Sequence, residues 1–281
     1  MIIKNSLADF KIMILKSGLY LVATPIGNLE DITLRALRIL KECDTIICED
    51  SRVSRKLLSV YNIEKPLMVY HDHNAEIMRP KILEKLHAGE KMTFITDAGM
   101  PLISDPGYKL VKMCRENAIY LTVIPGASSV LAGLVLSGMP SDKFAFCGFA
   151  EAGKFEEFTS YNATLVFFES APRLVKTLEK MSSAFLNRNV TVVREITKMF
   201  EEAQTGSFSE MIDHFIKHPP RGEIVICLSP PESIDASEDK IDELLKKALS
   251  EMSMKDASEM VSKVLGLPKK KVYQRALDFK E

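Results

Sequence analysis

Short apolar runs alternate with segments of helical periodicity through the first half of the chain. Residues 19–23 form an apolar run, and residues 28–42 follow with Leu34, Leu37 and Leu40 three positions apart. Such runs are typical of buried strands, and such spacing is typical of helices. The pattern predicts further strands at 45–48, 67–70, 92–96 and 121–124, and further helices at 54–61, 79–88 and 128–136. This alternation favours a parallel sheet covered by helices.

A second series of the same kind predicts another α/β domain. Its strands are expected at 144–149, 164–168, 189–194 and 223–228, and its helices at 174–181 and 207–215. A proline-containing polar linker precedes helices expected at 240–252, 255–265 and 269–279, which suggest a helix-turn-helix-like appendage. We therefore expect an N-terminal extension at 1–17, α/β domains at 18–138 and 139–229, a linker at 230–239 and a helical domain at 240–281.

The composition of the chain limits the classes of function that it can have. The formal net charge of -1 shows no overall basic excess, so any affinity for RNA must be local. The five cysteines form no C-x-x-C pair and are expected to be reduced core residues. Residues 1–17 lack the apolar core of a signal peptide, and no run approaches the roughly 18 apolar residues of a spanning helix. We expect a soluble, cytoplasmic protein.

Polar segments follow several of the predicted strands. TPIGNLEDIT (24–33) makes a tight turn through Pro25 and Gly27, although an ordinary strand–helix connection explains it equally well. It contains neither G-x-G-x-x-G nor a Walker lysine motif, which argues against dinucleotide and P-loop enzymes. CEDSR (48–52) places Asp50 and Arg52 at the edge of the sheet, where a structural ion pair is the simpler interpretation.

Two histidines leave the strand expected at 67–70. On an extended chain, the two-residue spacing of His71 and His73 points both rings to one side but supplies no further ligands. We therefore expect no metal site, and interpret YHDHN (70–74) as a source of hydrogen bonds to substrate.

The longest polar loop, TDAGMPLISDPG (96–107), is the strongest candidate for ligand binding. Asp97 and Asp105 can accept hydrogen bonds from amino or ribose hydroxyl groups, and Gly99 and Gly107 permit close approach of the backbone to a ligand. A loop of Asx turns is the alternative. In PGASSV (125–130), backbone amides at a helix start could meet a carboxylate, or the serines simply cap the helix.

These segments, with VREITKMFEE (193–202) and RGEIV (221–225), together resemble the tetrapyrrole methylase superfamily and, within it, the branch that methylates small-subunit ribosomal RNA. The resemblance implies S-adenosylmethionine bound between two α/β domains, a homodimer, and methylation of a cytidine 2′-hydroxyl in the decoding region. The residues it places at the cofactor are Pro25, Asp97, Ala98, Gly99, Pro101, Ile103, Ser104, Asp105, Ala127, Ser128, Phe168 and Glu169.

Residues 253–273 resemble the helical extension of the same branch. Lys269, Lys270 and Lys271 offer the local basic patch for RNA, although a solvated helix start is the alternative. Two segments depart from the family pattern: residues 151–158 are acidic, and residues 169–174 lack the histidine usual before the arginine.

Methyl transfer to a ribose hydroxyl depends on positioning, helped by a base or by a cation that stabilises the alkoxide. Asp50, Arg52 and His71 are the expected catalytic residues. One alternative is a methyltransferase of the same superfamily acting on a tetrapyrrole or a protein side chain, which the PIGN loop and the helical tail argue against. Another is a non-catalytic RNA-binding or ribosome-assembly factor that keeps the cofactor pocket for stability.

Overall fold

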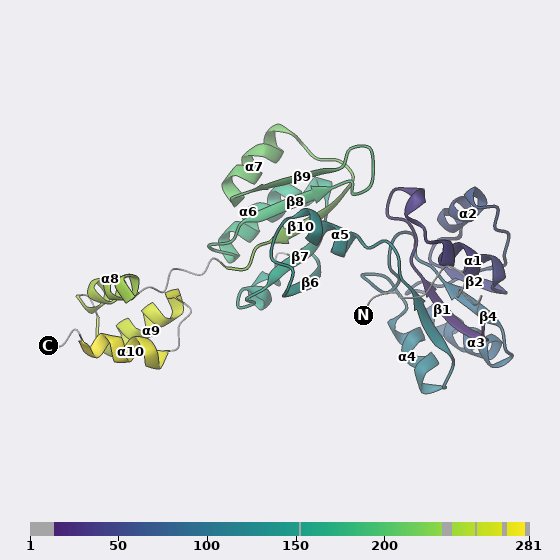
Figure 1. Cartoon of the computed structure of the whole chain (residues 1–281), viewed down its shortest axis with the longest axis horizontal. Helices are drawn as coiled ribbons and strands as arrows, with labels where there is room; N and C mark the ends of the chain where they lie inside the picture. The colour runs from purple at the N-terminus through teal and green to yellow at the C-terminus, as the bar shows by residue number, and fades with distance from the viewer. Residues whose placement is uncertain (1–13, 152, 232–237, 251, 266–268, 279–281) are drawn as a thin grey trace, which may run out of the picture.

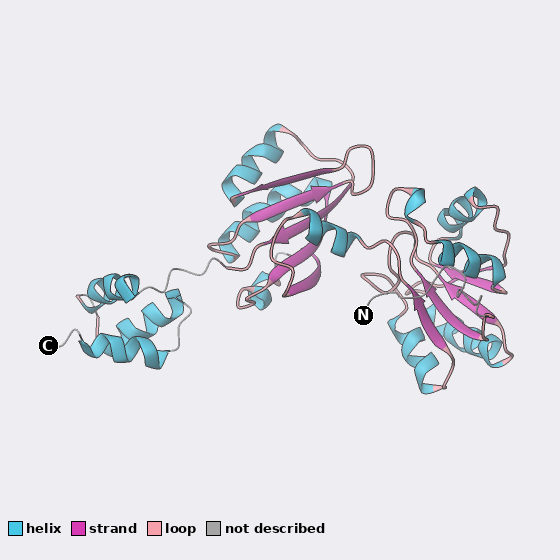
Figure 2. Cartoon of the chain, in the orientation of Figure 1, coloured by secondary structure: helices cyan, strands magenta, loops and turns pink. Residues whose placement is uncertain are grey.

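The computed structural model describes residues 14–151, 153–231, 238–250, 252–265 and 269–278. Two α/β domains and a separate group of helices follow one another along the chain (Figures 1 and 2). This arrangement confirms the expected fold class. The N-terminal extension up to residue 13, most of the expected linker, and the turn at Gly266 and Pro268 lie outside the described residues.

The first sheet is parallel, as predicted, with strand order β3-β2-β4-β1-β5. Its strands are β1 (Gly18–Val22), β2 (Thr45–Cys48), β3 (Leu67–Val69), β4 (Lys91–Phe94) and β5 (Leu121–Ile124). Its helices are α1 (Leu34–Glu42), α2 (Ser51–Val60), α3 (Ala75–His87) and α4 (Tyr108–Glu116). Residues of α1 and α2 share one apolar core with the sheet, and residues of α3 and α4 share another. Cover on both faces explains why these strands are continuous apolar runs.

Some boundaries in this domain differ from the prediction. The helix expected from Asn28 is a 3-10 turn (Leu29–Asp31) followed by α1, because Thr33 Oγ1 accepts the N–H of Ala36 and starts a new helix there. Helix α3 begins at Ala75, before the expected residue 79, and α4 was not expected at all.

The second sheet is mixed, with strand order β6-β7-β10-β8-β9. Its strands are β6 (Phe144–Phe149), β7 (Thr164–Ser170), β8 (Val190–Arg194), β9 (Glu202–Gly206) and β10 (Glu223–Leu228). The β6–β7 pair is parallel, and the other pairs are antiparallel. The edge strand β9 was missed because its sequence, EAQTG, lacks an apolar run. Short 3-10 turns occupy Phe155–Phe158 and Ala171–Arg173.

Helices α6 (Leu174–Ala184) and α7 (Phe208–Lys217) cover one face of this sheet, and α5 (Ser129–Leu136) covers the other. Gly133 of α5 approaches so closely that a Cβ there would lie 2.6 Å from Cγ1 of Val225. Helix α5, which lies within the range expected for the first domain, therefore packs on the second sheet.

Helices α8 (Glu238–Leu249), α9 (Met254–Leu265) and α10 (Lys269–Leu277) share a small apolar core that includes Leu245, Val261 and Val272. A bidentate ion pair between Arg275 and Asp242, at 2.7 and 2.8 Å, joins α10 to α8. Among the described residues, every helix falls short of the length and apolar character that crossing a bilayer requires.

Candidate functional site

Polar loops of the first domain converge at the carboxyl edge of its parallel sheet. Glu49 and Asp50 follow β2, His71 follows β3, and residues 96–107 follow β4. The chain after β1 is held against the last of these loops, because Thr24 and Gly99 exchange backbone hydrogen bonds of 2.9 and 3.1 Å. The carboxyl edge of an open α/β sheet is where such folds bind ligands.

A cavity of about 220 Å³ lies between this edge and the second domain. The first domain contributes the chain after β1 and the loop after β4, and α5 contributes its first turn. The second domain closes the cavity with residues of β6, β7, β10 and the loop after β8. The lining residues are Ile26, Ala98, Gly99, Met100, Ile103, Ser104, Asp105, Ser128, Ser129, Val130, Phe149, Phe168, Glu169, Ile196, Glu223, Ile224 and Val225.

Most residues expected at the cofactor line this cavity. They are Ala98, Gly99, Ile103, Ser104, Asp105, Ser128, Phe168 and Glu169. The other four are adjacent in sequence to lining residues but do not line the cavity themselves: Pro25, Asp97, Pro101 and Ala127. The wall made by Phe149, Ile196 and residues 223–225 was not expected from the sequence, although Ile196 lies within VREITKMFEE and residues 223–225 lie within RGEIV.

The loop after β4 has an unusual backbone conformation. Leu102 and Ser104 have positive φ angles of 73° and 65°, a region that residues with a side chain seldom occupy. Gly99, at φ 81°, lines the cavity as expected. Gly107 lies outside the described lining, and a Cβ there would lie 2.5 Å from the ring of Phe94, so this glycine lets the loop pack closely on the core.

Several carboxyl groups gather at this end of the sheet. Burial raises the pKa of Asp105 to about 6, and the nearby charge of Glu49 adds to the shift. Burial also raises the pKa values of Glu49 and Asp97, each with a further contribution from the other carboxylates around it. These groups therefore hold protons more readily than ordinary carboxyls do.

Asp50 behaves in the opposite way. Its carboxylate accepts the backbone N–H of Arg52 at 2.7 Å and pairs with the Arg52 guanidinium, also at 2.7 Å. These bonds lower the pKa of Asp50 to about 2, and they make Asp50 the N-cap of α2. The ion pair considered as the simpler interpretation is therefore present.

His71 keeps one ring atom unpaired. Its Nδ1 is buried and has no hydrogen-bond partner within the described part of the chain, and its ring lies 5.8 Å from that of His73. The described lining of the cavity includes none of Asp50, Arg52 and His71.

The second-domain wall is rigidly held. Glu169 is buried and accepts hydrogen bonds from the Ser170 N–H at 2.6 Å, from Arg173 at 2.8 Å, and from the Thr177 hydroxyl. Phe168 packs against Phe149, with ring centroids 5.6 Å apart. A satisfied carboxylate and an aromatic pair thus make a wall of fixed shape.

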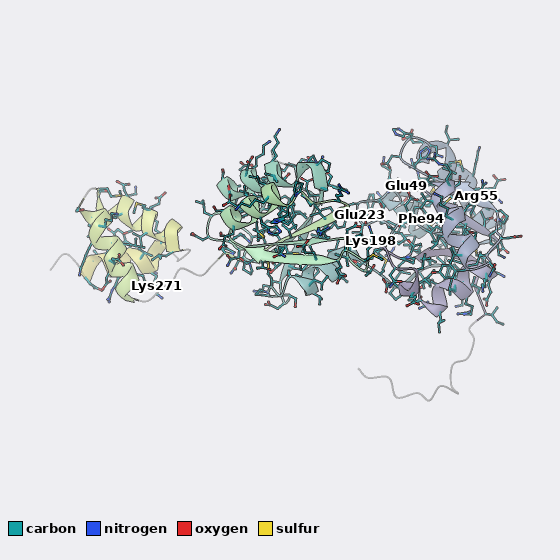
Figure 3. The ribbon with its side chains drawn as sticks, turned by 90° about the horizontal axis from the view of Figure 1, so that it is seen from above. Glu49, Arg55, Phe94, Lys198, Glu223 and Lys271 are labelled. Carbon is teal, nitrogen blue, oxygen red and sulfur yellow. The ribbon has the colours of Figure 1, made fainter. Side chains whose placement is uncertain are left out.

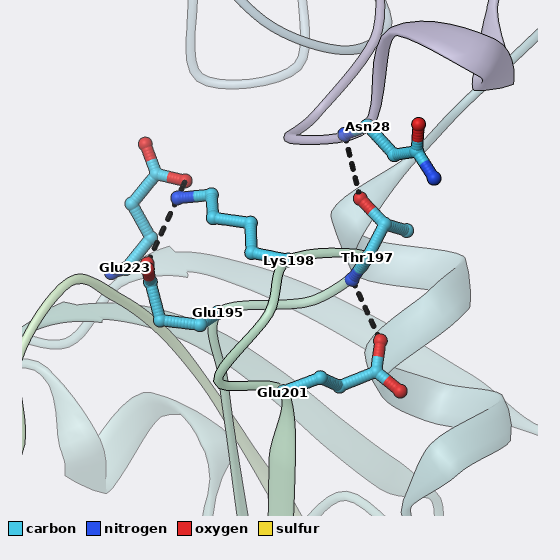
Figure 4. Close-up of polar contacts among 6 residues, drawn as sticks. All are labelled: Asn28, Glu195, Thr197, Lys198, Glu201 and Glu223. Atoms are coloured by element: carbon cyan, nitrogen blue, oxygen red, sulfur yellow. Dashed lines mark hydrogen bonds and ion pairs between the residues drawn. The ribbon is translucent and has the colours of Figure 1, made fainter.

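The loop after β8 reaches the first domain beside the cavity (Figure 4). The backbone N–H of Asn28 donates to Thr197 Oγ1 at 3.1 Å, and a Cβ at Gly27 would lie 2.6 Å from Cγ of Lys198. The Lys198 ammonium bridges Glu195 at 2.8 Å and Glu223 at 3.0 Å. Lys198 and Glu223 lie on the side of the second domain that faces the first (Figure 3). Three segments that are distant in sequence, at PIGN, REITK and RGE, meet here.

The sequence matches two families. Residues 18–212 match the family described as Tetrapyrrole (Corrin/Porphyrin) Methylases, and residues 235–280 match the RsmI C-terminal HTH domain. Relatives named ribosomal RNA small subunit methyltransferase I are 43% identical in Mesorhizobium japonicum, covering 95% of this chain and 94% of the relative, and 44% identical in Rickettsia prowazekii, covering 85% and 87%. The Bacillus subtilis relative of the same name is 38% identical, covering 91% and 92%.

Solved structures share the fold. A cobalt precorrin-4 methyltransferase superposes with a TM-score of 0.57 at 18% identity, covering 75% of this chain and 94% of that one. The uroporphyrin-III C-methyltransferase of Thermus thermophilus, complexed with S-adenosyl homocysteine, gives 0.54 at 21% identity, covering 75% and 97%. At these identities the likeness concerns the fold alone.

Proposed function

The chain belongs to the tetrapyrrole methylase family, among the ribosomal RNA small subunit methyltransferases I, and from that premise we propose that it transfers a methyl group from S-adenosylmethionine to the ribose 2′-hydroxyl of a cytidine in the decoding region of small-subunit ribosomal RNA. The observation that carries the proposal is the cavity at the carboxyl edge of the parallel sheet, lined by Asp105 and Ser128 from one side and by Phe168 from the other. The relatives' name supplies the class of RNA.

The chemistry of the cavity suits S-adenosylmethionine. Asp105 offers a carboxylate to ribose hydroxyls or to an amino group, and Ile26, Ile103 and Val225 offer apolar contact to a purine. The start of α5 lines the cavity through Ser128, Ser129 and Val130, and the N-terminus of a helix favours a carboxylate. Pro25, Asp97, Pro101 and Ala127 would support this lining from the adjacent chain.

Proton transfer is the part of the reaction that this chain must assist. S-adenosylmethionine would supply an electrophilic methyl group. The ribose hydroxyl would lose its proton to a base as its oxygen takes the methyl carbon, whose bond to sulfur breaks and leaves a neutral thioether. A base works best with a pKa near the working pH. Glu49, whose pKa is raised, suits that role better than Asp50, whose pKa is lowered to about 2, and His71 offers its unpaired Nδ1 as a second acceptor. Asp50 then orients Arg52, whose exposed guanidinium can stabilise the developing alkoxide.

The helical domain is proposed to bind RNA through the start of α10. Lys270 and Lys271 are exposed there, whereas Lys269 forms an ion pair with Glu259 at 2.6 Å. Cations at a helix N-terminus oppose the helix dipole, and a bound phosphate would offset that cost. We propose that the substrate is the assembled small subunit and that the reaction takes place in the cytoplasm.

A homodimer is proposed from exposed apolar side chains of α5. Leu131 and Val135, one helical turn apart, are 52% and 75% exposed, and neighbouring apolar side chains left in water favour association.

The proposed reaction is tested by transfer of labelled methyl from S-adenosylmethionine to small subunits that lack the modification. Label in RNA supports the proposal, and label in protein or in a tetrapyrrole alone refutes it.

A further inference from the structure

Two large apolar side chains are exposed on the turn that begins at the cavity residue Ile196. Met199 and Phe200, at this turn between β8 and β9, are 90% and 66% exposed. Single exposed apolar residues are common on protein surfaces. An adjacent pair on a turn that contributes to a proposed active site indicates a binding partner.

The turn that carries them is braced. Glu195 and Thr197 have positive φ angles of 50° and 65°. Residues with a side chain seldom adopt this conformation, and β-branched residues such as threonine adopt it least. The Thr197 N–H donates to Glu201 Oε2 at 2.6 Å, and the Glu201 N–H donates to the Lys198 carbonyl at 3.1 Å. Strained residues persist only where their surroundings hold them, and they gather at functional sites.

The base of the turn belongs to the cavity itself. Ile196 lines it, as does Glu223, which binds Lys198. The hydrogen bond from Asn28 to Thr197 fixes the turn against the first domain. Met199 and Phe200 therefore lie three and four positions after a residue that lines the cavity, on a turn that is fixed against the first domain.

The local charges disfavour a phosphate as the partner. Lys198 is already shared by Glu195 and Glu223, and Glu201 adds a further carboxylate to the turn. These acidic groups would repel a phosphate, whereas they would not repel an uncharged base. Bases in single-stranded RNA stack on aromatic side chains irrespective of sequence.

We propose that Met199 and Phe200 form a platform on which an unpaired base of the RNA substrate stacks, next to the nucleotide that receives the methyl group. The proposal rests on the proposed function, because it places RNA at this cleft. The turn contacts the face of a base and makes no contact with the RNA backbone.

The test uses the full-length protein and the variants Phe200→Ala, Met199→Ala and Phe200→Trp. KM and kcat are measured with small subunits, and Kd is measured by fluorescence anisotropy with an unstructured oligoribonucleotide of mixed sequence. We expect Phe200→Ala to raise both KM and Kd about tenfold, Met199→Ala to raise them less, and Phe200→Trp to restore them. The affinity for S-adenosylmethionine should stay unchanged. Leu186→Ala, at a side chain 71% exposed elsewhere in the second domain, is the matched control and should change nothing.

The dependence of Kd on salt separates stacking from phosphate contact. A stacking platform predicts the wild-type slope in Phe200→Ala, because no phosphate contact is lost. An unchanged Kd, a shallower slope, or a change of oligomeric state by light scattering would overturn the proposal, the last pointing to a second copy of the chain. If the wild type methylates no RNA, the proposed function fails, while the oligoribonucleotide Kd still judges the platform.

Discussion

The backbone N–H of Asn28 donates a 3.1 Å hydrogen bond to Oγ1 of Thr197, 169 positions further along the chain. The bond joins the two α/β domains beside the cavity, where Ile26 and Ile196, their neighbours in sequence, both contribute to the lining. Its role is therefore to set the distance between the two walls.

Thr197→Val removes the acceptor oxygen at nearly constant volume. We expect the affinity for S-adenosylmethionine to fall about threefold to tenfold, because a hydrogen bond that joins the two domains beside the cavity is lost. Thr197→Ser keeps the oxygen and should retain most of the affinity. Calorimetric titration measures both, and equal affinities in the valine, serine and wild-type proteins would contradict this role.

Asp105→Asn should alter stability in a pH-dependent way. The folded-state pKa of Asp105 is about 6, above its usual value of 3.8, so its contribution to stability is present below about pH 4 and is lost as the pH rises through 6. The variant should therefore gain Tm over the wild type at pH 7.5 but not at pH 3.5. It should also bind S-adenosylmethionine more weakly at pH 7.5. A difference in Tm that is the same at both pH values would refute the assigned burial of this charge.

Glu49→Gln and Asp50→Asn test which carboxylate accepts the proton. We expect Glu49→Gln to lower kcat about a hundredfold, the lower end of the usual contribution of a general base, with cofactor affinity unchanged. Asp50→Asn should cost much less, because an asparagine still caps α2 and the pKa of about 2 makes Asp50 a poor base. His71→Asn, measured in parallel, should lower kcat if its Nδ1 takes part. A larger loss in Asp50→Asn than in Glu49→Gln would reverse the assignment.

Lys270→Ala with Lys271→Ala should weaken RNA binding by loss of charge. Each phosphate contact contributes about 0.7 to the slope of log K against log salt for a single strand. We expect the double variant to lose one to two such contacts while its kcat on saturating RNA is retained. Lys176→Ala with Lys180→Ala, on α6 of the second domain, is the control. The same slope in all three proteins would remove α10 from the RNA interface.

Val135→Glu places a charge in the middle of the proposed dimer surface. Because Val135 is 75% exposed in the single chain, the substitution should leave Tm of the isolated chain nearly unchanged while it separates the subunits. Light scattering after size exclusion would show half the wild-type mass. A wild-type protein that is itself monomeric would refute the dimer.

The first sheet was well predicted from the sequence because its inner strands, β2, β4 and β1, are largely buried and therefore consist mainly of apolar residues. Parallel strands end at one edge, so the segments after β2, β3 and β4 could be expected to meet there. The strand β9 could not be found, because EAQTG lacks an apolar run and pairs only with β8, at the edge of the sheet. The wall containing Phe149, Ile196 and Glu223 was not predicted for another reason: these residues are distant in sequence, and only the fold brings them together beside the first domain. The raised pKa of Asp105 likewise could not be predicted, because it arises from burial in the fold and from Glu49, which is distant in sequence.

The most direct measurement is transfer of labelled methyl from S-adenosylmethionine to assembled small subunits that lack the modification. The labelled nucleotide is then mapped, and its ribose is analysed for 2′-O-methylation. The account predicts label on the 2′-oxygen of one decoding-region cytidine, and its loss in Glu49→Gln while cofactor binding persists. Cofactor binding by the wild type without any label in RNA would contradict it, and would favour a member of the same family that acts on a tetrapyrrole or a protein side chain.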